Sequence, residues 1–130
     1  ALLNGGKLDS ARILEASTLD VMARNQIGEF EAGEMFSVAP KLSNDVHLFP
    51  GVEDKFGLGV LLNSEPVPGG RSAGSLMWAG LHNTYFWIDR ERDIGGVLMT
   101  QMLPFADPAV LELLGEFETA VYASAAAESD

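Results

Sequence analysis

Apolar residues gather in four short runs in the middle and later part of this chain, at 56–63, 72–79, 84–89 and 94–101. Each run is rich in β-branched, aromatic or leucine side chains, which is typical of strands. Turn-forming residues fill positions 64–70, and a charged link at 90–93 separates the last two runs. Connections this short join antiparallel neighbours, so the pattern predicts an antiparallel meander.

The run at 84–89 is apolar on both faces, because Tyr85 and Trp87 alternate with Phe86 and Ile88. A strand of this kind needs cover on both sides, from helices or from a second layer. We therefore expect it to be central in its sheet. Trp87 is expected to belong to the core.

A helical period appears twice. Near the start, Ser17 and Asp20 fit the S-x-x-D capping pattern, and apolar residues at 19, 22, 23 and 27 follow, which predicts a helix over about 18–26. Near the end, Asp107 supplies an N-cap and Pro108 the first helical position. The apolar stripe at 110, 114, 117 and 121 then predicts an amphipathic helix packed on the sheet.

Three glutamates of this second helix, Glu112, Glu116 and Glu118, lie off the apolar stripe and are expected to face water. The small, acidic tail at 123–130 is expected to fray. Residues 1–6 suggest the last turn of a helix closed by glycine. Residues 28–55 have no sustained period and predict a long irregular connection, of the kind that either covers a fold or contributes to a site.

Together these elements predict an α+β fold, an antiparallel sheet with packed helices, in a single domain or fragment over 1–130. Hydrophobic residues make up 47% of the chain, too many for a disordered segment. The net charge of -11 would repel nucleic acid and anionic lipid. With no membrane-length apolar run, we expect a soluble protein, and the absence of cysteine leaves cytoplasm and periplasm equally open.

Three features between 74 and 101 carry a family resemblance. They are the triplet Trp78-Ala79-Gly80, the aromatic strand that follows it and ends at Asp89, and the run 95–101 that leads to a terminal helix. In this order they resemble the third active-site element and last strands of class C β-lactamases and family VIII carboxylesterases. The resemblance implies the C-terminal portion of a β-lactamase/transpeptidase-like fold, in a serine hydrolase that needs no cofactor.

In that family the triplet lines the substrate cleft, and the backbone N–H just after it helps to form the oxyanion hole. The resemblance therefore assigns Trp78, Ala79 and Gly80 to the cleft and the N–H of Leu81 to the oxyanion hole. His82 follows directly and is either a substrate-facing group or a turn residue in contact with its neighbour. Whether Trp78 stacks on a ligand or packs in the core is open from the sequence.

The triplet departs from the β-lactamase form, in which its first residue is a lysine that pairs with the carboxylate of the antibiotic. Trp78 cannot form that ion pair, and Ala79 lacks the hydroxyl of the usual threonine. The resemblance therefore implies a small neutral ester as substrate, with a β-lactam as the alternative. The family's Tyr-x-Asn motif is also missing after Tyr85 and Tyr122.

The family's nucleophile is the serine of a Ser-x-x-Lys motif, and none of the nine serines here has lysine three residues later. No catalytic residue is therefore assigned to this chain, which is expected to be inactive alone. Its expected partner is the N-terminal part of the same enzyme, which would carry the nucleophile. An exposed sheet edge would make the isolated chain bind that part or self-associate. A stable monomer would instead indicate a non-catalytic binding or structural module.

Two further motifs have competing interpretations. Gly70-x-Ser72-x-Gly74 matches the nucleophile elbow of α/β-hydrolases, but a loop precedes the serine and a strand follows it, whereas an elbow has a strand before and a helix after. A strand entry is the favoured interpretation of Ser72. His47 near Asp45 suggests a metal ligand, yet only two histidines exist and no ligand spacing appears, so no metal is expected.

Overall fold

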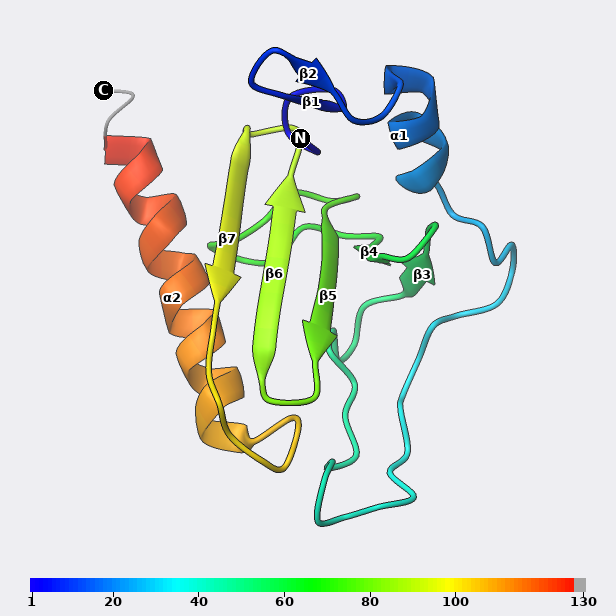
Figure 1. Ribbon diagram of the computed structural model, residues 1–130. Coiled ribbons are helices and arrows are strands. Elements are labelled where there is room, and N and C mark those ends of the chain that lie inside the picture. Colours follow the sequence, from blue (N-terminus) through cyan, green and yellow to red (C-terminus); the bar gives the residue numbers. More distant parts are fainter. Residues whose placement is uncertain (128–130) are drawn as a thin grey trace.

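The computed structural model describes residues 1–127 and shows a small two-stranded hairpin, a five-stranded antiparallel sheet and two helices (Figure 1). In chain order the elements are β1 (Lys7–Leu8), β2 (Ala11–Arg12), α1 (Ala16–Met22), β3 (Asp54–Phe56), β4 (Leu61–Asn63), β5 (Leu76–Gly80), β6 (Thr84–Asp89), β7 (Ile94–Leu98) and α2 (Pro108–Ala127). Neither helix has the length and hydropathy that a membrane crossing requires within the described residues.

The five strands of the main sheet, β3 to β7, follow one another in space in the order of the chain. Strand β6 has the predicted bounds and pairs antiparallel with β5 over residues 84–88 and with β7 over residues 85–89, as the meander requires. Its Tyr85 and Trp87 pack in the core that α2 covers, while Phe86 and Ile88 pack against a second cluster around Leu76. The predicted meander and the central position of β6 are confirmed. Phe86 and Ile88 are only half-buried, so the described residues cover the second face of β6 in part.

The predicted strand 56–63 was wrong as a single element. Gly57 and Gly59 interrupt it, and the chain turns back so that β3 and β4 form a hairpin. Gly59 has a positive φ of 81°, which glycine adopts without steric cost. The N–H of Gly57 donates to the carbonyl of Val60 at 2.8 Å and closes the turn.

The N-terminal segment also differs from expectation. Helix α1 begins at Ala16, with Glu15 as its N-cap and no side-chain capping bond, so Ser17 lies inside the helix and does not cap it. The helix ends at Met22, four residues before the predicted end. Residues 2–6 form turns and are not assigned to a helix, although Gly5 and Gly6 have the positive φ angles of a glycine-closed helix end.

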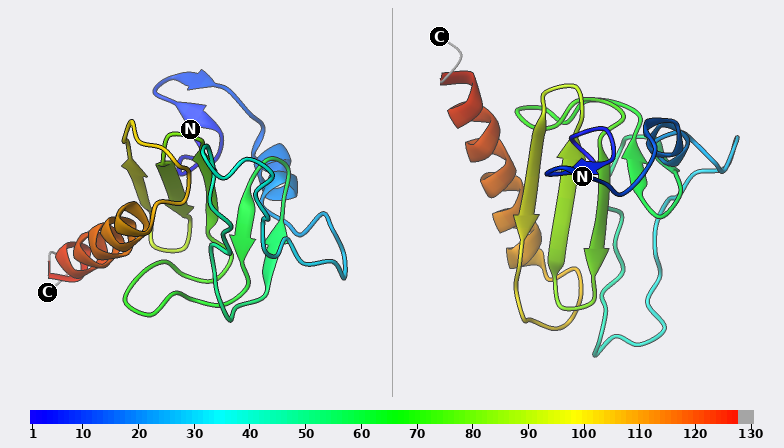
Figure 2. Two further views of the ribbon diagram at one scale, coloured as in Figure 1. Left: turned by 90° about the horizontal axis from the view of Figure 1, so that it is seen from below. Right: turned by 45° about the horizontal axis from the view of Figure 1, so that its top comes forward.

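Helix α2 lies along one face of the sheet beside β7 (Figure 2). Asp107 caps it as predicted, because its Oδ1 accepts the backbone N–H groups of Ala109 at 3.0 Å and Val110 at 3.2 Å. The helix continues to Ala127, so 123–127 are helical where fraying was expected, and 128–130 lie outside the described residues. Glu118, expected to face water, is buried.

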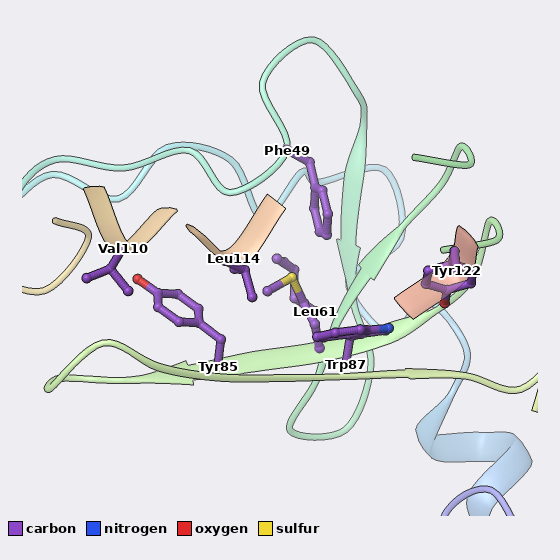
Figure 3. Packing of buried hydrophobic residues seen from close by; sticks show 8 residues of the cluster. Phe49, Leu61, Tyr85, Trp87, Val110, Leu114 and Tyr122 are labelled. Atoms are coloured by element: carbon purple, nitrogen blue, oxygen red, sulfur yellow. The ribbon is translucent and has the colours of Figure 1, made fainter. Parts of the chain in front are cut away.

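Between sheet and helix lies a core whose largest member is the indole of Trp87, 1% exposed (Figure 3). Phe117 of α2 meets this indole edge-on, with ring centroids 5.5 Å apart. Gly96, opposite Trp87 on β7, leaves room for the ring, because a Cβ there would lie 2.0 Å from it. Trp87 is therefore the core residue that the sequence predicted.

Candidate functional site

The triplet singled out in the sequence forms the last three residues of β5, and Leu81, His82 and Asn83 form the tight turn to β6. Asn83 has a φ of 60° and donates its N–H to the carbonyl of Gly80 at 3.0 Å. This is the arrangement of a three-residue hairpin loop whose last residue is left-handed. Leu81 and His82 are exposed at its tip.

Asn83 is the residue of this turn that the sequence analysis missed. Its side chain is buried and holds the turn to the segment before α2: Nδ2 donates to the carbonyls of Met102 at 3.1 Å and Pro104 at 2.7 Å. Its Oδ1 accepts the hydroxyl of Tyr85 at 3.0 Å and the N–H of Asp107 at 3.2 Å. The signal available in the sequence was an asparagine at a hairpin turn, a residue that tolerates positive φ.

His82 contributes its backbone to the same anchor. Its carbonyl accepts hydrogen bonds from the hydroxyl of Thr100 at 2.7 Å and from the N–H of Met102 at 3.3 Å. These bonds fix the turn, and with it the orientation of the Leu81 peptide. A substrate contact by the His82 side chain remains a prediction.

Strand β5 lies in the middle of the sheet, but its C-terminal end is an open edge. Strand β4 pairs only with Leu76 and Met77, so among residues 1–127 no strand lies beside Trp78–Gly80 on the side away from β6. The triplet therefore lies at an open edge of the sheet, although β5 as a whole is not an edge strand. Main-chain groups at such an edge can face a ligand.

Beside this open end is a hollow of about 170 Å³, which we call the strand-end pocket. Four of the five predicted site residues, Trp78 to Leu81, line it; His82 does not. The remaining lining residues are Met35, Leu48 and Phe105, which come from the two irregular segments before β3 and before α2.

The long connection at 28–55 reaches this pocket because it is tied to the segment before α2. The N–H of Asn44 donates to the carbonyl of Phe105 at 2.9 Å, and the N–H of Phe105 donates to the carbonyl of Leu42 at 2.8 Å. Met35 and Val46 pair across the connection as an isolated antiparallel bridge. The segment is irregular as predicted up to residue 53, and β3 begins at Asp54, inside the predicted connection. The segment contributes a wall of the pocket.

A second hollow of about 330 Å³, the loop pocket, lies between this connection and the β3–β4 hairpin. It shares Met35, Leu48 and Trp78 with the strand-end pocket. The half-buried indole of Trp78 stands edge-on to Phe56, with ring centroids 5.0 Å apart. Trp78 thus packs against an aromatic neighbour and also lines both pockets. Stacking of Trp78 on a ligand stays a prediction.

His47 lies next to Asp54 and not in a cluster of ligands. Its Nε2 is 3.3 Å from Oδ2 of Asp54, whose Oδ1 accepts the N–H of Gly33 at 2.9 Å. Within residues 1–127 no group of three or more histidine, aspartate or glutamate side chains is arranged to hold a metal ion.

Ser72 lies in the loop before β5, and a strand follows it, so the strand–turn–helix context of a nucleophile elbow is absent. Its N–H donates to Oδ2 of Asp89 at 2.8 Å, and its carbonyl accepts Nδ2 of Asn63 at 2.9 Å and Oγ of Ser75 at 2.8 Å. These bonds make Ser72 the buried entry to β5, the interpretation favoured from the sequence.

A hollow of about 540 Å³ lies on the other side of this loop, against α2, and is lined by Ser72, Arg92 and Tyr122 among others. Although it is larger than the other two pockets, it is not lined by the β5 triplet or its turn. The hydroxyl of Tyr122 donates to Oδ2 of Asp89 at 2.9 Å in the wall of this region. We assign these contacts to the joint between helix and sheet.

No family model matches this chain. An acyltransferase of Penicillium decumbens, calJ, is 28% identical over 113 residues, which are 85% of this chain and 27% of that protein. Unliganded simvastatin synthase, LovD, of Aspergillus terreus superimposes over 95% of this chain and 31% of its own, with a TM-score of 0.73 and 22% identity. The LovD9 mutant gives a TM-score of 0.70 at 21% identity, over 95% and 32% of the two chains.

This chain therefore spans between a quarter and a third of the length of the proteins it matches. LovD is an acyltransferase with the β-lactamase/transpeptidase-like fold, within the superfamily of β-lactamase-like serine hydrolases. At this level of identity the structural match establishes the fold alone. The predicted α+β fold with the β-lactamase/transpeptidase-like arrangement is confirmed.

Proposed function

We propose that this chain is the C-terminal portion of a serine enzyme that transfers or hydrolyses acyl groups. In this proposal it supplies the oxyanion strand, which is β5 together with the Leu81 N–H that follows it in the oxyanion hole. The observation that carries the proposal is the position of Leu81, directly after Gly80, at the open end of β5 and in the wall of an apolar pocket. The match to two acyltransferases over most of the chain supports it.

Acyl transfer through a serine places negative charge on the substrate's carbonyl oxygen in each tetrahedral intermediate. A main-chain N–H held at the end of a paired strand stabilises that charge without reorganising. The Leu81 N–H is the donor that this chain would provide. The second donor would be the N–H of the nucleophile itself, on another part of the protein. Water as acceptor makes the enzyme an esterase of the family VIII kind, and an alcohol makes it an acyltransferase.

The substrate that we propose is a neutral acyl ester. Trp78 offers an apolar face where a β-lactamase has the lysine that binds the antibiotic's carboxylate, and the pocket beside it is lined mainly by apolar side chains. A carboxylated β-lactam is the alternative, which a class C parent would favour.

The partner that we propose is the part of the same enzyme that carries a Ser-x-x-Lys motif. Two facts support this: the chain is under a third as long as its relatives, and none of its nine serines has lysine three residues later. The outer strand β7 offers a sheet edge where that part would add strands. The core between sheet and α2 favours the alternative of a self-sufficient binding module, which would remain monomeric.

A proline at position 81 tests the oxyanion role, because proline has no N–H and suits the first corner of a turn. In the enzyme that joins this chain to its Ser-x-x-Lys portion, Leu81→Pro should lower kcat for a simple ester about 100- to 1000-fold. Leu81→Ala, which keeps the N–H and shortens only the side chain in the pocket wall, is the matched control and should lose far less activity than Leu81→Pro. Equal activity of the two variants would refute the role of the Leu81 N–H.

A further inference from the structure

We propose that the loop pocket holds the acyl chain of an uncharged, medium-length ester, with Trp78 at the boundary between the chain and the reacting carbonyl. This inference rests on the proposed function, because it takes the strand-end pocket as the place of reaction. It adds a chain-binding site and a specificity for the end of the chain that does not react.

The two pockets are neighbours and share three side chains. Met35, Leu48 and Trp78 line both, so the loop pocket adjoins the hollow at the end of β5. An ester whose carbonyl lies at Leu81 therefore has the loop pocket as the adjoining space for its acyl chain. The shared residues are all half-buried, so each keeps a surface that a ligand can cover.

The loop pocket suits a hydrocarbon chain. Its volume is about 330 Å³, roughly twice that of the strand-end pocket. Its walls are mostly apolar, with Ile27, Phe30 and Ala32 from the long connection and Phe56 and Leu61 from the β3–β4 hairpin. Each methylene that moves from water into such a site strengthens binding about four-fold.

Its polar groups argue against a charged chain end. Asp54 and Glu31 line the loop pocket and not the strand-end pocket, so a negative charge on the far end of the chain would meet two acidic side chains. Asp54 is 1% exposed, which strengthens repulsion because the surroundings are less polar than water. His47 lies against Asp54 at 3.3 Å on its Oδ2 side and lines a different hollow.

The walls are held by bonds that do not depend on a ligand. The N–H of Ala32 donates to the carbonyl of Asp54 at 3.0 Å, and the N–H of Gly33 donates to its Oδ1 at 2.9 Å. The edge-on contact with Phe56 fixes the indole of Trp78 on the opposite side. The pocket is thus formed by main-chain contacts of the connection and by an aromatic pair.

The test is a titration of the 130-residue chain with methyl hexanoate, methyl butanoate and monomethyl adipate, followed by methyl and indole NMR signals. We expect saturable shifts at Met35 and Trp78 with methyl hexanoate. Methyl butanoate, two methylenes shorter, should bind about 16-fold more weakly. Monomethyl adipate carries a carboxylate in place of the terminal methyl of methyl hexanoate, and should bind at least ten-fold more weakly.

Ala32→Trp, which fills the loop pocket, should abolish these shifts, and Ala73→Trp on an exposed loop away from it should not. Binding that is independent of chain length, that favours the carboxylate, or that survives in a folded Ala32→Trp variant would overturn the inference. If Ala32→Trp does not fold, the comparison of methyl hexanoate with methyl butanoate in the unaltered chain tests the inference by itself. Because no catalysis is measured, failure here leaves the oxyanion role of Leu81 standing, and failure of that role leaves this binding result standing.

Discussion

Arg71 and Glu118 form an ion pair closed off from solvent, with side-chain exposures of 2% and 7%. Nε and the backbone N–H of Arg71 both donate to Oε1 of Glu118 at 2.9 Å, and Nη2 donates to Oε2. The guanidinium also lies over the rings of Phe49 and Trp87, at 5.5 and 5.3 Å from their centroids. One side chain of the loop before β5 thus joins that loop to α2 and to the core.

Removal of one charge from this pair should be strongly destabilising, because the other charge stays buried without compensation. We predict that Glu118→Gln lowers the free energy of unfolding by about 3 to 5 kcal/mol. Urea denaturation would measure the loss. Glu116→Gln, at an exposed position of the same helix, is the matched control and should change little. A loss of the same size in both variants would show that the ion pair is not responsible.

Asn83 combines a positive φ with four side-chain hydrogen bonds, and two substitutions separate these contributions. Asn83→Gly loses the bonds but suits the backbone, whereas Asn83→Ala loses the bonds and adds strain. We predict that both are destabilised and that the alanine variant is less stable than the glycine variant by about 1 to 2 kcal/mol. Thermal unfolding followed by circular dichroism measures the difference; an alanine variant as stable as the glycine variant would contradict the assignment.

Gly96 should tolerate no side chain. A Cβ at this position would lie 2.0 Å from the indole of Trp87, so Gly96→Ala must displace the ring or β7. We expect a loss of stability of about 1 to 3 kcal/mol and a changed environment of Trp87 in near-ultraviolet circular dichroism. Gly95→Ala is the control, because its nearest contacts would be 3.4 Å away. An unchanged spectrum for Gly96→Ala would contradict this packing.

Asp89 should make the fold sensitive to acid. Burial acts to raise the pKa of this carboxyl, but hydrogen bonds from the backbone of Ser72 and Arg92 and from Tyr122 outweigh burial and hold the pKa below its usual range. A lowered pKa in the folded state contributes stability above the unfolded pKa of about 3.9, and that stability is lost as the pH falls through the folded pKa.

Asp89→Asn removes this titration. The stability difference between wild type and Asp89→Asn should therefore be constant near neutral pH and shrink below about pH 4. Urea denaturation at several pH values measures it. A difference that does not change down to pH 2 would show that Asp89 is not the titrating group.

The strands β5 to β7 and α2 could be predicted because their apolar periods are local properties of the sequence. Only β6 has the predicted bounds, since β5 begins at Leu76 and β7 ends at Leu98, within the predicted runs. The β3–β4 hairpin was missed because its two glycines alternate with Leu58 and Val60, so the turn has the apolar pattern of a strand. The start of α1 was predicted at about residue 18 because the Ser17 pattern suggested a side-chain cap. The helix begins at Ala16 and has no side-chain cap.

The triplet at the end of β5 could be placed in a pocket wall from the resemblance, but the rest of that wall could not. Its other residues, Met35, Leu48 and Phe105, come from segments that have no regular pattern and meet only after folding. The burial of Glu118 was equally hidden, since its partner Arg71 lies 47 residues away in the sequence. Long-range pairs of this kind leave no period in the sequence.

The claim that this chain provides the oxyanion strand and not the nucleophile can be tested by fluorophosphonate labelling of the purified protein with its natural partners, followed by peptide mapping. We predict label on a serine of a co-purifying Ser-x-x-Lys segment and none on these 130 residues. Label on Ser72, or on any other serine of this chain, would contradict the account.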